Sequence, residues 1–374
     1  MPLNTFIFIG PEGPSPLEQW VLGARLAATA DLVAQLSACS EVAKIIIATP
    51  LPELKARYAD WPVTWDFDSE SETFHFGGRL AQLTAAYISP AFAYFGAGCA
   101  PLLAQTQIQP ALAETLATKA PFSITNNLLS SDWLISNCAA EIQARIERLG
   151  RDNMLAPVLK YEANLDVRAL PASAATRADI DTPADLFALA HHPHLPQHLR
   201  AYLDENPAPE KMQANWQAAR RLLAMPGSRI TLIGRVSAAA LSFLEARTRC
   251  WTRVFSEERG MTASGRQAQG NVHSLVARHL RNIGPTNFFA ELAEMTDLVI
   301  FDTRVILASM NLWPSAADRY ASDAGQPELI ADEFLRALTQ AAMNAPMPVL
   351  LGGHGVVTGD VYALLEAGLK RANG

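Results

Sequence analysis

The sequence predicts an α/β fold with two domains, each built on a mostly parallel sheet covered by helices. Strand-like apolar runs alternate with stretches of helical periodicity in both halves of the chain, and this alternation is typical of parallel sheets with helices on both faces. A chain of 374 residues is too long for one typical core. With 49% apolar and 18% charged residues, the chain has enough apolar side chains to form two buried cores.

In the first half, β-branched and aromatic runs bounded by Gly or Pro predict strands. Lys44–Ala48, for example, is β-branched and stops before Pro50, which indicates a buried strand. The expected elements, in chain order, are strand Thr5–Ile9, helix Leu17–Leu36, strand Lys44–Ala48, strand Val63–Phe67, helix Gly78–Ser89, strand Ala91–Phe95 and helix Gln109–Thr118. We expect the first domain to span residues 1–195 and to hold a mixed sheet.

A polar helical connector is expected at residues 196–226, where Pro207 and Pro209 interrupt the helical pattern. The second domain, residues 227–374, is expected to be a Rossmann-like three-layer sandwich. Its expected elements, in chain order, are strand Arg229–Gly234, helix Ser237–Arg247, strand Thr252–Ser256, helix Asn271–Leu280, strand Asp297–Asp302, helix Glu328–Asn344 and strand Pro348–Gly352.

Charge and cysteine content narrow the class of protein. A net charge of −7 argues against a general nucleic-acid binder, which needs a basic surface to neutralise phosphates. The cysteines form no Cys-x-x-Cys pair, so we expect reduced thiols and no zinc site or disulfide framework; they are Cys39, Cys99, Cys138 and Cys250. No basic leader or membrane-length apolar segment is present. We therefore expect a cytoplasmic protein that has no membrane partner. Whether it forms a homo-oligomer remains open.

Three motifs follow one another in the first half. They are Phe-Gly-Gly-Arg-Leu at 76–80, Phe-Gly-Ala-Gly-Cys-Ala-Pro-Leu-Leu at 95–103 and Asp-Ile-Asp-Thr-Pro-Ala-Asp-Leu at 179–186. In this order they resemble motifs of the MobA-like and CofC-like nucleotidyltransferases, which have the GT-A fold. The family's counterparts are a Leu-Gly-x-Arg-Leu helix start, a Gly-x-Asp-x-Pro-x-Leu strand end, and the segment that closes the nucleotide-binding sheet. The resemblance covers residues 1–190 and implies a GT-A-like sheet.

The resemblance also implies magnesium chemistry, which this sequence supports only in part. Nucleotidyl transfer uses a divalent cation held by carboxylates at strand ends. Gly98 and Cys99 stand where the family's Gly-x-Asp-x-Pro supplies its carboxylate, whereas Asp179 or Asp181 matches the second metal-binding carboxylate. Magnesium is therefore expected, at Asp179 and Asp181, only if this site is active.

The opening loop departs from the family as well. The resemblance implies a glycine-rich loop that ends in an Arg and a Lys, which grip the phosphates. Residues 10–16 instead carry three prolines, which lack N–H donors, together with Glu12, and the nearest cation is Arg25. We therefore expect nucleotidyltransferase ancestry with a degenerate active site.

The segment Asp179–Leu186 also fits an ordinary helix start. Asp181 or Thr182 would be the N-cap, and Pro183 would occupy the first turn. Common ancestry and a simple helix cap both remain open for this segment.

Polar side chains follow consecutive predicted strands of the second domain. Ligands of open parallel sheets bind at the carboxyl ends of strands, and arginine forks hold phosphate or carboxylate groups. The predicted ligand-binding residues are Arg235, Glu257, Arg259, Arg266, Asp302, Arg304 and His354. Local alternatives remain open, such as an Arg304–Asp302 ion pair and a tight glycine turn at His354. The segment that includes Arg319 and Asp323 either completes the pocket or forms a capped helix with local ion pairs.

These observations predict a nucleotidyltransferase-like protein that binds a nucleotide or another phosphorylated or anionic small metabolite, with the ligand in the second domain. An active enzyme of this kind would be a transferase. The alternative is a non-catalytic ligand-binding or scaffold protein with a degenerate nucleotidyltransferase domain. The chain contains no Gly-x-Ser-x-Gly, Walker or His-Glu-x-x-His motif that would indicate another reaction.

Overall fold

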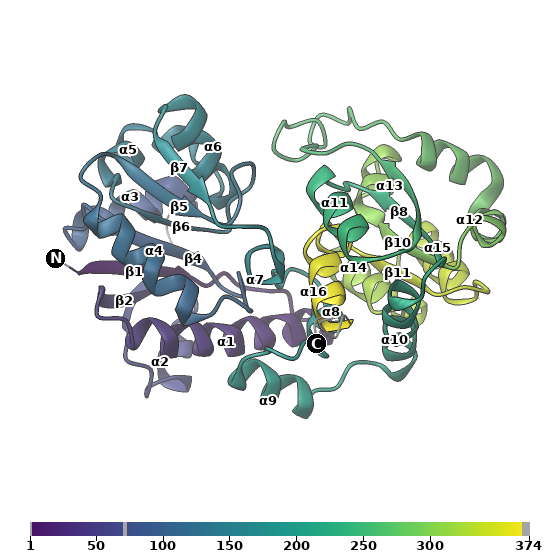
Figure 1. The fold of residues 1–374 in the computed structure, drawn as a ribbon, viewed down its shortest axis with the longest axis horizontal. Helices are drawn as coiled ribbons and strands as arrows, with labels where there is room; N and C mark the ends of the chain where they lie inside the picture. The colour runs from purple at the N-terminus through teal and green to yellow at the C-terminus, as the bar shows by residue number, and fades with distance from the viewer. Residues whose placement is uncertain (1, 70–72, 369–374) are drawn as a thin grey trace. The chain divides into compact units, whose positions relative to one another are not determined.

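The computed structural model describes residues 2–69 and 73–368. The chain divides into two compact units, which are shown in Figure 1. The first unit comprises Met1–Glu12, Arg25–Arg177 and Pro196–Leu199, and the second comprises Gly13–Ala24, Ala178–Leu195 and Arg200–Gly374. The motif Asp179–Leu186, which we expected to close the first domain, therefore lies in the second unit.

The first unit is built on a seven-stranded mixed sheet with the order β3-β2-β1-β4-β6-β5-β7. Strand β6 runs antiparallel to β4 and β5, while the other neighbouring strands are parallel. The strands are β1 (Leu3–Phe8), β2 (Val42–Thr49), β3 (Thr64–Phe67), β4 (Phe92–Gly96), β5 (Phe122–Thr125), β6 (Trp133–Ser136) and β7 (Asp166–Ala169). The predicted α/β class and mixed sheet are confirmed.

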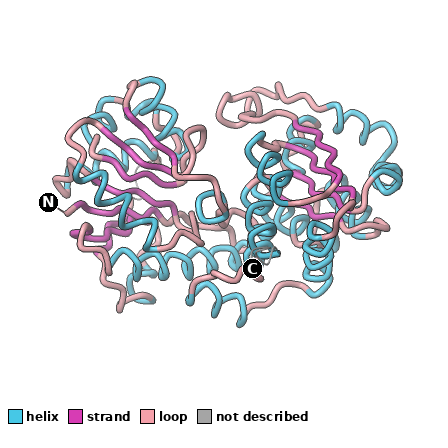
Figure 2. The backbone as a smooth tube through the Cα atoms, viewed as in Figure 1, coloured by secondary structure: helices cyan, strands magenta, loops and turns pink. Residues whose placement is uncertain are grey.

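Helices cover this sheet, as the cyan coils around the magenta strands show in Figure 2. One core joins alternate strand residues, including Phe6, Phe8 and Tyr94, to Leu80 of α3 and Ile142 of α5. The helices are α1 (Pro16–Ser37), which continues from the second unit, α2 (Glu53–Arg57), α3 (Phe76–Ala86), α4 (Gln105–Ala117), α5 (Ala139–Ala144), α6 (Leu155–Pro157), α7 (Ala174–Arg177) and the short turns η1 (Ile146–Arg148), η2 (Asp152–Met154) and η3 (Val158–Glu162).

The second unit holds a four-stranded, fully parallel sheet with the order β11-β10-β8-β9. Its strands are β8 (Arg229–Gly234), β9 (Trp251–Ser256), β10 (Leu298–Asp302) and β11 (Val349–Gly352). The chain passes from β8 outward to β9 and then returns to β10 on the other side of β8. The carboxyl ends of β8 and β10 therefore form the topological switch point of this sheet, the place where open parallel sheets bind ligands.

Helices pack on both faces of the second sheet. One core joins Ile233, Phe301 and Leu351 of the strands to Leu280 of α12 and Leu338 of α15. The helices are α8 (Pro183–Leu189), α9 (Gln197–Glu205), whose first residues lie in the first unit, α10 (Glu210–Ala224), α11 (Ala238–Arg247), α12 (Leu275–Met295), α13 (Thr303–Ser309), α14 (Ala316–Asp323), α15 (Glu333–Met343), α16 (Gly359–Gly368) and the turns η4 (Pro327–Leu329) and η5 (Gly355–Val357).

The predicted helix 271–280 is wrong at both ends. Ser274 caps α12, and the helix continues to Met295. The helix is interrupted at Gly284, which has a φ of +79° and is followed by Pro285. Elsewhere, the cysteines are free, and no helix among the described residues is long and apolar enough to cross a membrane.

We expect the aromatic core of the first sheet to dominate the stability of the first unit. Phe95 is fully buried and stacks on Trp133 with 5.8 Å between ring centroids. Phe95→Ala should therefore lower the free energy of unfolding by about 3–5 kcal/mol, measured by urea denaturation. Phe74 is 58% exposed, so Phe74→Ala is the matched control and should cost much less. Equal losses for the two variants would contradict this core.

Candidate functional site

The first unit has its own switch point, between the carboxyl ends of β1 and β4. The opening loop that follows β1 brings Glu12 into an ion pair with Arg25. The cation nearest to this loop is thus neutralised within the protein. Cys99, which follows β4, is buried with 6% of its surface exposed. The opening loop, residues 9–15, therefore contributes no basic side chain of its own.

Two carboxylates lie near the end of β4, at the place where the family's aspartate is absent. The hydroxyl of Tyr94 donates to Asp152 Oδ2 at 3.0 Å, and Asp132 accepts from the Asn126 amide at 2.5 Å. Burial, together with the charge of Asp152, raises the pKa of Tyr94 well above its usual range. The sequence analysis did not connect these residues with β4, because they follow other segments of the chain.

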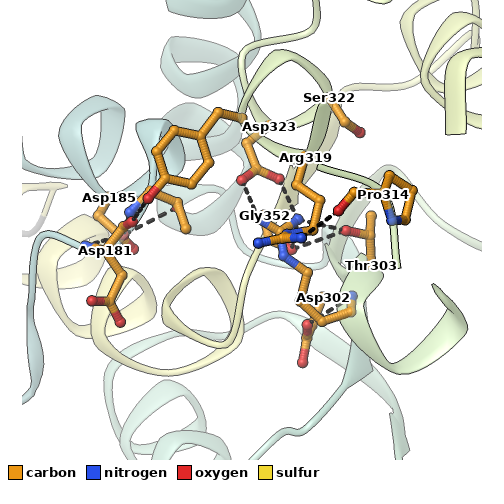
Figure 3. Close-up of polar contacts among 12 residues, drawn as sticks. Asp181, Asp185, Asp302, Thr303, Pro314, Arg319, Ser322, Asp323 and Gly352 are labelled. Carbon is orange, nitrogen blue, oxygen red and sulfur yellow. Dashed lines mark hydrogen bonds and ion pairs between the residues drawn. The ribbon is translucent and has the colours of Figure 1, made fainter. Parts of the chain in front are cut away.

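The motif Asp179–Leu186 forms a capped helix start in the second unit. Thr182 is the N-cap of α8 and Pro183 is its first residue, so the predicted helix start is confirmed, and this geometry fits both common ancestry and a simple helix cap. The carboxylate of Asp185 accepts from the backbone N–H of Asp181 at 2.9 Å and from that of Thr182 at 2.6 Å (Figure 3). These bonds satisfy donors that a helix N-terminus leaves free.

The two residues matched to a metal site lie at the start of this cap. Asp179 accepts a hydrogen bond from the N–H of Ile180 at 2.8 Å, and the carbonyl of Asp181 accepts one from Tyr320 at 2.7 Å. Among residues 2–69 and 73–368, no group of three or more His, Cys, Asp or Glu side chains has the arrangement of a metal site. Magnesium binding at Asp179 and Asp181 stays a prediction.

Asp185 also contacts a glycine-rich loop after β11. A Cβ built on Gly355 would lie 2.1 Å from Asp185 Oδ1, so only glycine fits there. Beside Asp185 lies Asp360 of α16, which is 1% exposed and whose two carboxyl oxygens have no hydrogen-bond partner of normal geometry among the described residues. Two buried carboxyls can lie together when they share a proton.

The pKa directions agree with a shared proton. Burial, with the charge of Asp360, raises the pKa of Asp185 well above its usual range. Burial also raises the pKa of Asp360 to about 7, although the hydrogen bond from Asp185 opposes this increase. The start of α16 thus brings a second buried carboxyl beside Asp185 at the start of α8, and burial favours the protonated form of this pair.

At the switch point of the second sheet, Arg235 and Asp302 form a two-bonded ion pair. Arg235 Nε lies 2.6 Å from Asp302 Oδ2, and Nη2 lies 3.1 Å from Oδ1. Gly234 makes this approach possible, because its φ is +120° and a Cβ there would lie 2.4 Å from the Asp302 side chain. Burial alone would raise the pKa of Asp302, but the neighbouring basic groups, Arg235 first among them, together lower it. Asp302 is therefore a buried carboxylate that holds Arg235 at the strand ends.

Arg304 makes a second buried ion pair, and its partner is Asp323. The two carboxylate oxygens of Asp323 accept from Nη1 at 2.7 Å and from Nη2 at 2.5 Å (Figure 3). Burial raises the pKa of Asp323, whereas the pKa of Arg304 rises through Asp323. The bidentate geometry favours the charged form of both side chains. Two alternatives had remained open for these residues. The segment that carries Asp323 is a helix capped by Ser315. Arg304 donates its backbone N–H to Asp302, while its guanidinium pairs with Asp323 and not with Asp302.

His354 and Arg259 complete the group at this edge. His354 is exposed, and its pKa is lowered to about 4 by desolvation and by the charges of Arg235 and Arg259, against the charge of Asp302. His354 is therefore neutral near pH 7. The Arg259 side chain is exposed and makes no hydrogen bond or ion pair among the described residues, while the Arg259 carbonyl accepts from Arg266 Nη2 at 3.2 Å.

The other predicted ligand residues make local contacts. Glu257 accepts from the hydroxyl of Ser274 and, at 2.8 Å, from the N–H of Leu275, so it caps α12. Arg266 pairs with Glu258 at 2.8 Å. The structure thus brings together Arg235, Asp302, His354 and Arg259, with Arg304 directly behind Asp302. The sequence analysis missed Asp360, because α16 was not predicted.

No protein-family model matches the sequence, and no curated protein matches it. Solved nucleotidyltransferases are similar to about half of the chain. A cytidylyltransferase from Leptospira borgpetersenii serovar Hardjo-bovis (strain JB197) is 11% identical, covers 55% of this chain and 96% of its own, and has a TM-score of 0.40. A 4-diphosphocytidyl-2C-methyl-D-erythritol synthase is 8% identical, covers 50% of this chain and 96% of its own, and has a TM-score of 0.34.

A third solved structure, CMP:2-keto-3-deoxy-manno-octonic acid synthetase complexed with CTP, is 10% identical, covers 45% of this chain and 90% of its own, and has a TM-score of 0.33. Similarity at this level says nothing about the residues of a site or about an activity.

We expect Gly355 to be far less replaceable than its neighbour Gly353. A Cβ at 355 would overlap Asp185 Oδ1, whereas a Cβ at 353 would find its nearest atom, Thr182 Cγ2, at 3.3 Å. Gly355→Ala should therefore lower the free energy of unfolding by about 1–3 kcal/mol, and Gly353→Ala by less, in urea denaturation. The reverse order would show that the loop does not pack on Asp185.

The carboxyl pair should make stability fall as pH rises. The pKa of Asp360 is raised in the folded protein, from 3.8 to about 7, so the unfolded chain binds fewer protons between these values. The free energy of unfolding should therefore decrease from about pH 4 to about pH 7. Asp360→Asn should reduce this slope in urea denaturation, whereas the exposed Asp204→Asn should leave it unchanged. An unaltered slope in Asp360→Asn would contradict the shared proton.

Proposed function

We propose that the second unit binds a small anionic metabolite, such as a nucleotide or a phosphorylated compound, at the carboxyl ends of β8 and β10. The observation that carries this proposal is the convergence of Arg235, Asp302, His354 and Arg259 at the switch point of the parallel sheet. Sheets of this kind bind ligands at such points, because successive helices leave toward opposite faces and loops surround the strand ends.

The charges at this edge favour a ligand that presents one anionic group. Three of the four predicted arginines are neutralised by carboxylates of the protein: Arg235 by Asp302, Arg266 by Glu258 and Arg304 by Asp323. Arg259 is exposed and unpaired within the described chain, and we assign it as the anion contact. A carboxylate or a single phosphoryl group matches this charge better than a triphosphate, which draws on several cations and a metal ion.

The paired residues would position the ligand. Asp302 is fully buried and holds Arg235 by two bonds, so the Arg235 side chain, which is 15% exposed, is fixed before a ligand arrives. Such preorganisation reduces the entropy lost on binding. The neutral imidazole of His354 can donate one hydrogen bond and accept another, which suits a hydroxyl or amide of the ligand.

We further propose that the first unit does not perform nucleotidyl transfer. The ion pair between Arg25 and Glu12 supports this proposal, because it removes the cation nearest to the opening loop. The prolines of that loop support it as well, since they cannot donate hydrogen bonds to phosphate. The first unit would then contribute structure to a ligand-binding protein.

Calorimetric titration with inorganic phosphate tests the site in the second unit. Arg259→Ala should weaken phosphate binding about tenfold or more, because a charge-assisted hydrogen bond is lost. Arg278→Ala is the matched control, an exposed arginine of α12, and should bind like the wild type. Equal binding by both variants and the wild type would remove Arg259 from the site.

A charge series tests the ligand class separately. The series consists of dimethyl phosphate, inorganic phosphate and tripolyphosphate, in order of rising negative charge. The first two compounds have one phosphorus centre, and tripolyphosphate has three. We expect little gain in affinity from phosphate to tripolyphosphate. If affinity rises steeply along the series and Arg259→Ala abolishes the rise, the site stands but the single anionic group is contradicted. If none of the three compounds binds, the site itself is contradicted.

A further inference from the structure

A cavity of about 580 Å³ lies in the second unit and shares no lining residue with the anion site. Its volume is within the range of small-molecule pockets. The lining comes from the start of α1, from the end of α9 with the loop after it, and from the segment around η4. It consists of two aromatic residues, three prolines, two leucines and three carboxamide residues, and none of them is charged. We refer to this cavity as the α1–α9 pocket.

The two aromatic rings of the α1–α9 pocket are held in place by hydrogen bonds. Trp20 Nε1 donates to the carbonyl of Asn206 at 3.0 Å, and the hydroxyl of Tyr202 donates to the carbonyl of Trp20 at 3.0 Å. Gly23 leaves the space for this contact, because a Cβ there would overlap the Tyr202 side chain. The N–H and the O–H are thus used within the protein, which leaves the π electrons of the rings for a ligand. Such electrons attract cations.

The carboxamides of the pocket keep acceptor oxygens available. Gln19 Nε2 donates to the carbonyl of Gly13 at 2.8 Å, and Asn206 Nδ2 donates to that of Tyr202 at 2.9 Å. The side-chain oxygens of both residues accept no hydrogen bond among the described residues, and the side chain of Gln326 makes none there. A ligand that donates hydrogen bonds therefore fits these oxygens.

The surroundings of the pocket are acidic. Glu205, Glu210 and Glu328 each stand next to a lining residue in the chain, and all three are exposed. Their side chains make no hydrogen bond or ion pair among the described residues. Adjacent Cα atoms are about 3.8 Å apart, so these carboxylates act on the pocket within about one Debye length. Asp204 and Lys211, each two positions from a lining residue, carry opposite charges and leave this excess unchanged.

Two arginines in this part of the second unit offset only a part of the negative charge. Arg319 lies close enough to the buried Glu18 for the two charges to interact and cancel. Arg336 donates to the carbonyl of Ile330 at 3.1 Å and adds one positive charge. Neither arginine lines the pocket. Three exposed carboxylates therefore stand against one guanidinium, and the local charge is negative.

We propose that the α1–α9 pocket binds a small organic cation, which consists of an ammonium group on an apolar body. The aromatic rings and the free amide oxygens receive the ammonium group, and the prolines and leucines pack against the apolar body. The acidic surroundings favour a cation over a neutral or anionic compound of the same shape. This inference does not depend on the proposed anion site, which selects the opposite charge.

Three probes of nearly the same shape test the charge of the ligand. Benzylamine, benzyl alcohol and benzoate carry one ring each and are cationic, neutral and anionic at pH 7. In calorimetric titration of the full chain, benzylamine should bind about tenfold more tightly than benzyl alcohol, and excess benzoate should not displace it. The proposal is overturned if benzylamine does not bind, if benzyl alcohol binds equally well, or if benzoate displaces benzylamine.

Two substitutions in the lining locate the bound benzylamine. Gln326→Leu removes an amide that makes no hydrogen bond among the described residues, so the fold should be retained while benzylamine binding weakens about fivefold or more. Trp20→Leu should weaken it about tenfold through loss of the aromatic face. Trp313 is 48% exposed and lies outside the lining, so Trp313→Leu is the matched control. Unchanged binding in Gln326→Leu and Trp20→Leu would show that benzylamine binds elsewhere and would overturn the assignment.

A further variant tests the acidic surroundings. Glu205→Gln combined with Glu328→Gln should weaken benzylamine binding about threefold at low salt and leave benzyl alcohol unaffected, and high salt should remove the difference. Glu294 of α12 is exposed and is neither a lining residue nor next to one, so Glu294→Gln is the control that should bind like the wild type. Equal binding by the double variant and the wild type at low salt would contradict the selection of a cation.

Discussion

The contact between Arg235 and Asp302 organises the carboxyl edge of the second sheet. It forms where β8 and β10 lie side by side and the chain changes direction, and Gly234 leaves the space that it requires. Asp302 also caps α13 through the N–H of Arg304, whose guanidinium is then directed to Asp323. A fully buried carboxylate costs much solvation free energy unless it is paired, so removing either partner would leave an unpaired buried charge. The positions of α13, Arg304 and His354 follow from this pair.

A second polar contact ties the ends of the chain's second unit together. Asp185 belongs to a segment before the connector, and Asp360 belongs to the last helix, yet they share one buried site against Gly355. This contact explains why residues 178–195 belong to the second unit and not to the first. The loop that carries His354 lies between the Arg235–Asp302 pair and the carboxyl pair, so the ligand edge is supported from both sides.

Local patterns were sufficient for much of the fold. β-Branched runs such as Lys44–Ala48 and Leu298–Asp302 form strands, and the helix start at Thr182 follows from short-range capping chemistry. The short strands β5 and β6 were not predicted, whereas β3, which also has four residues, was. Helix α16 was missed because it is buried nearly all round, so its sequence shows no polar face.

The sequence by itself determined the α/β class, the alternation of elements and the polar residues that follow the strands, because these depend on local propensity and on the period of apolar side chains. Tertiary structure alone decided which charged side chains pair within the protein and which stay exposed. Arg304 could have paired with Asp302, but the packing of α14 presents Asp323 instead, and Arg266 is held by Glu258. Pairing depends on distances between segments remote in the chain, which no local pattern specifies. The same physical reason placed the motif Asp179–Leu186 against Gly355 and left the Arg259 side chain exposed.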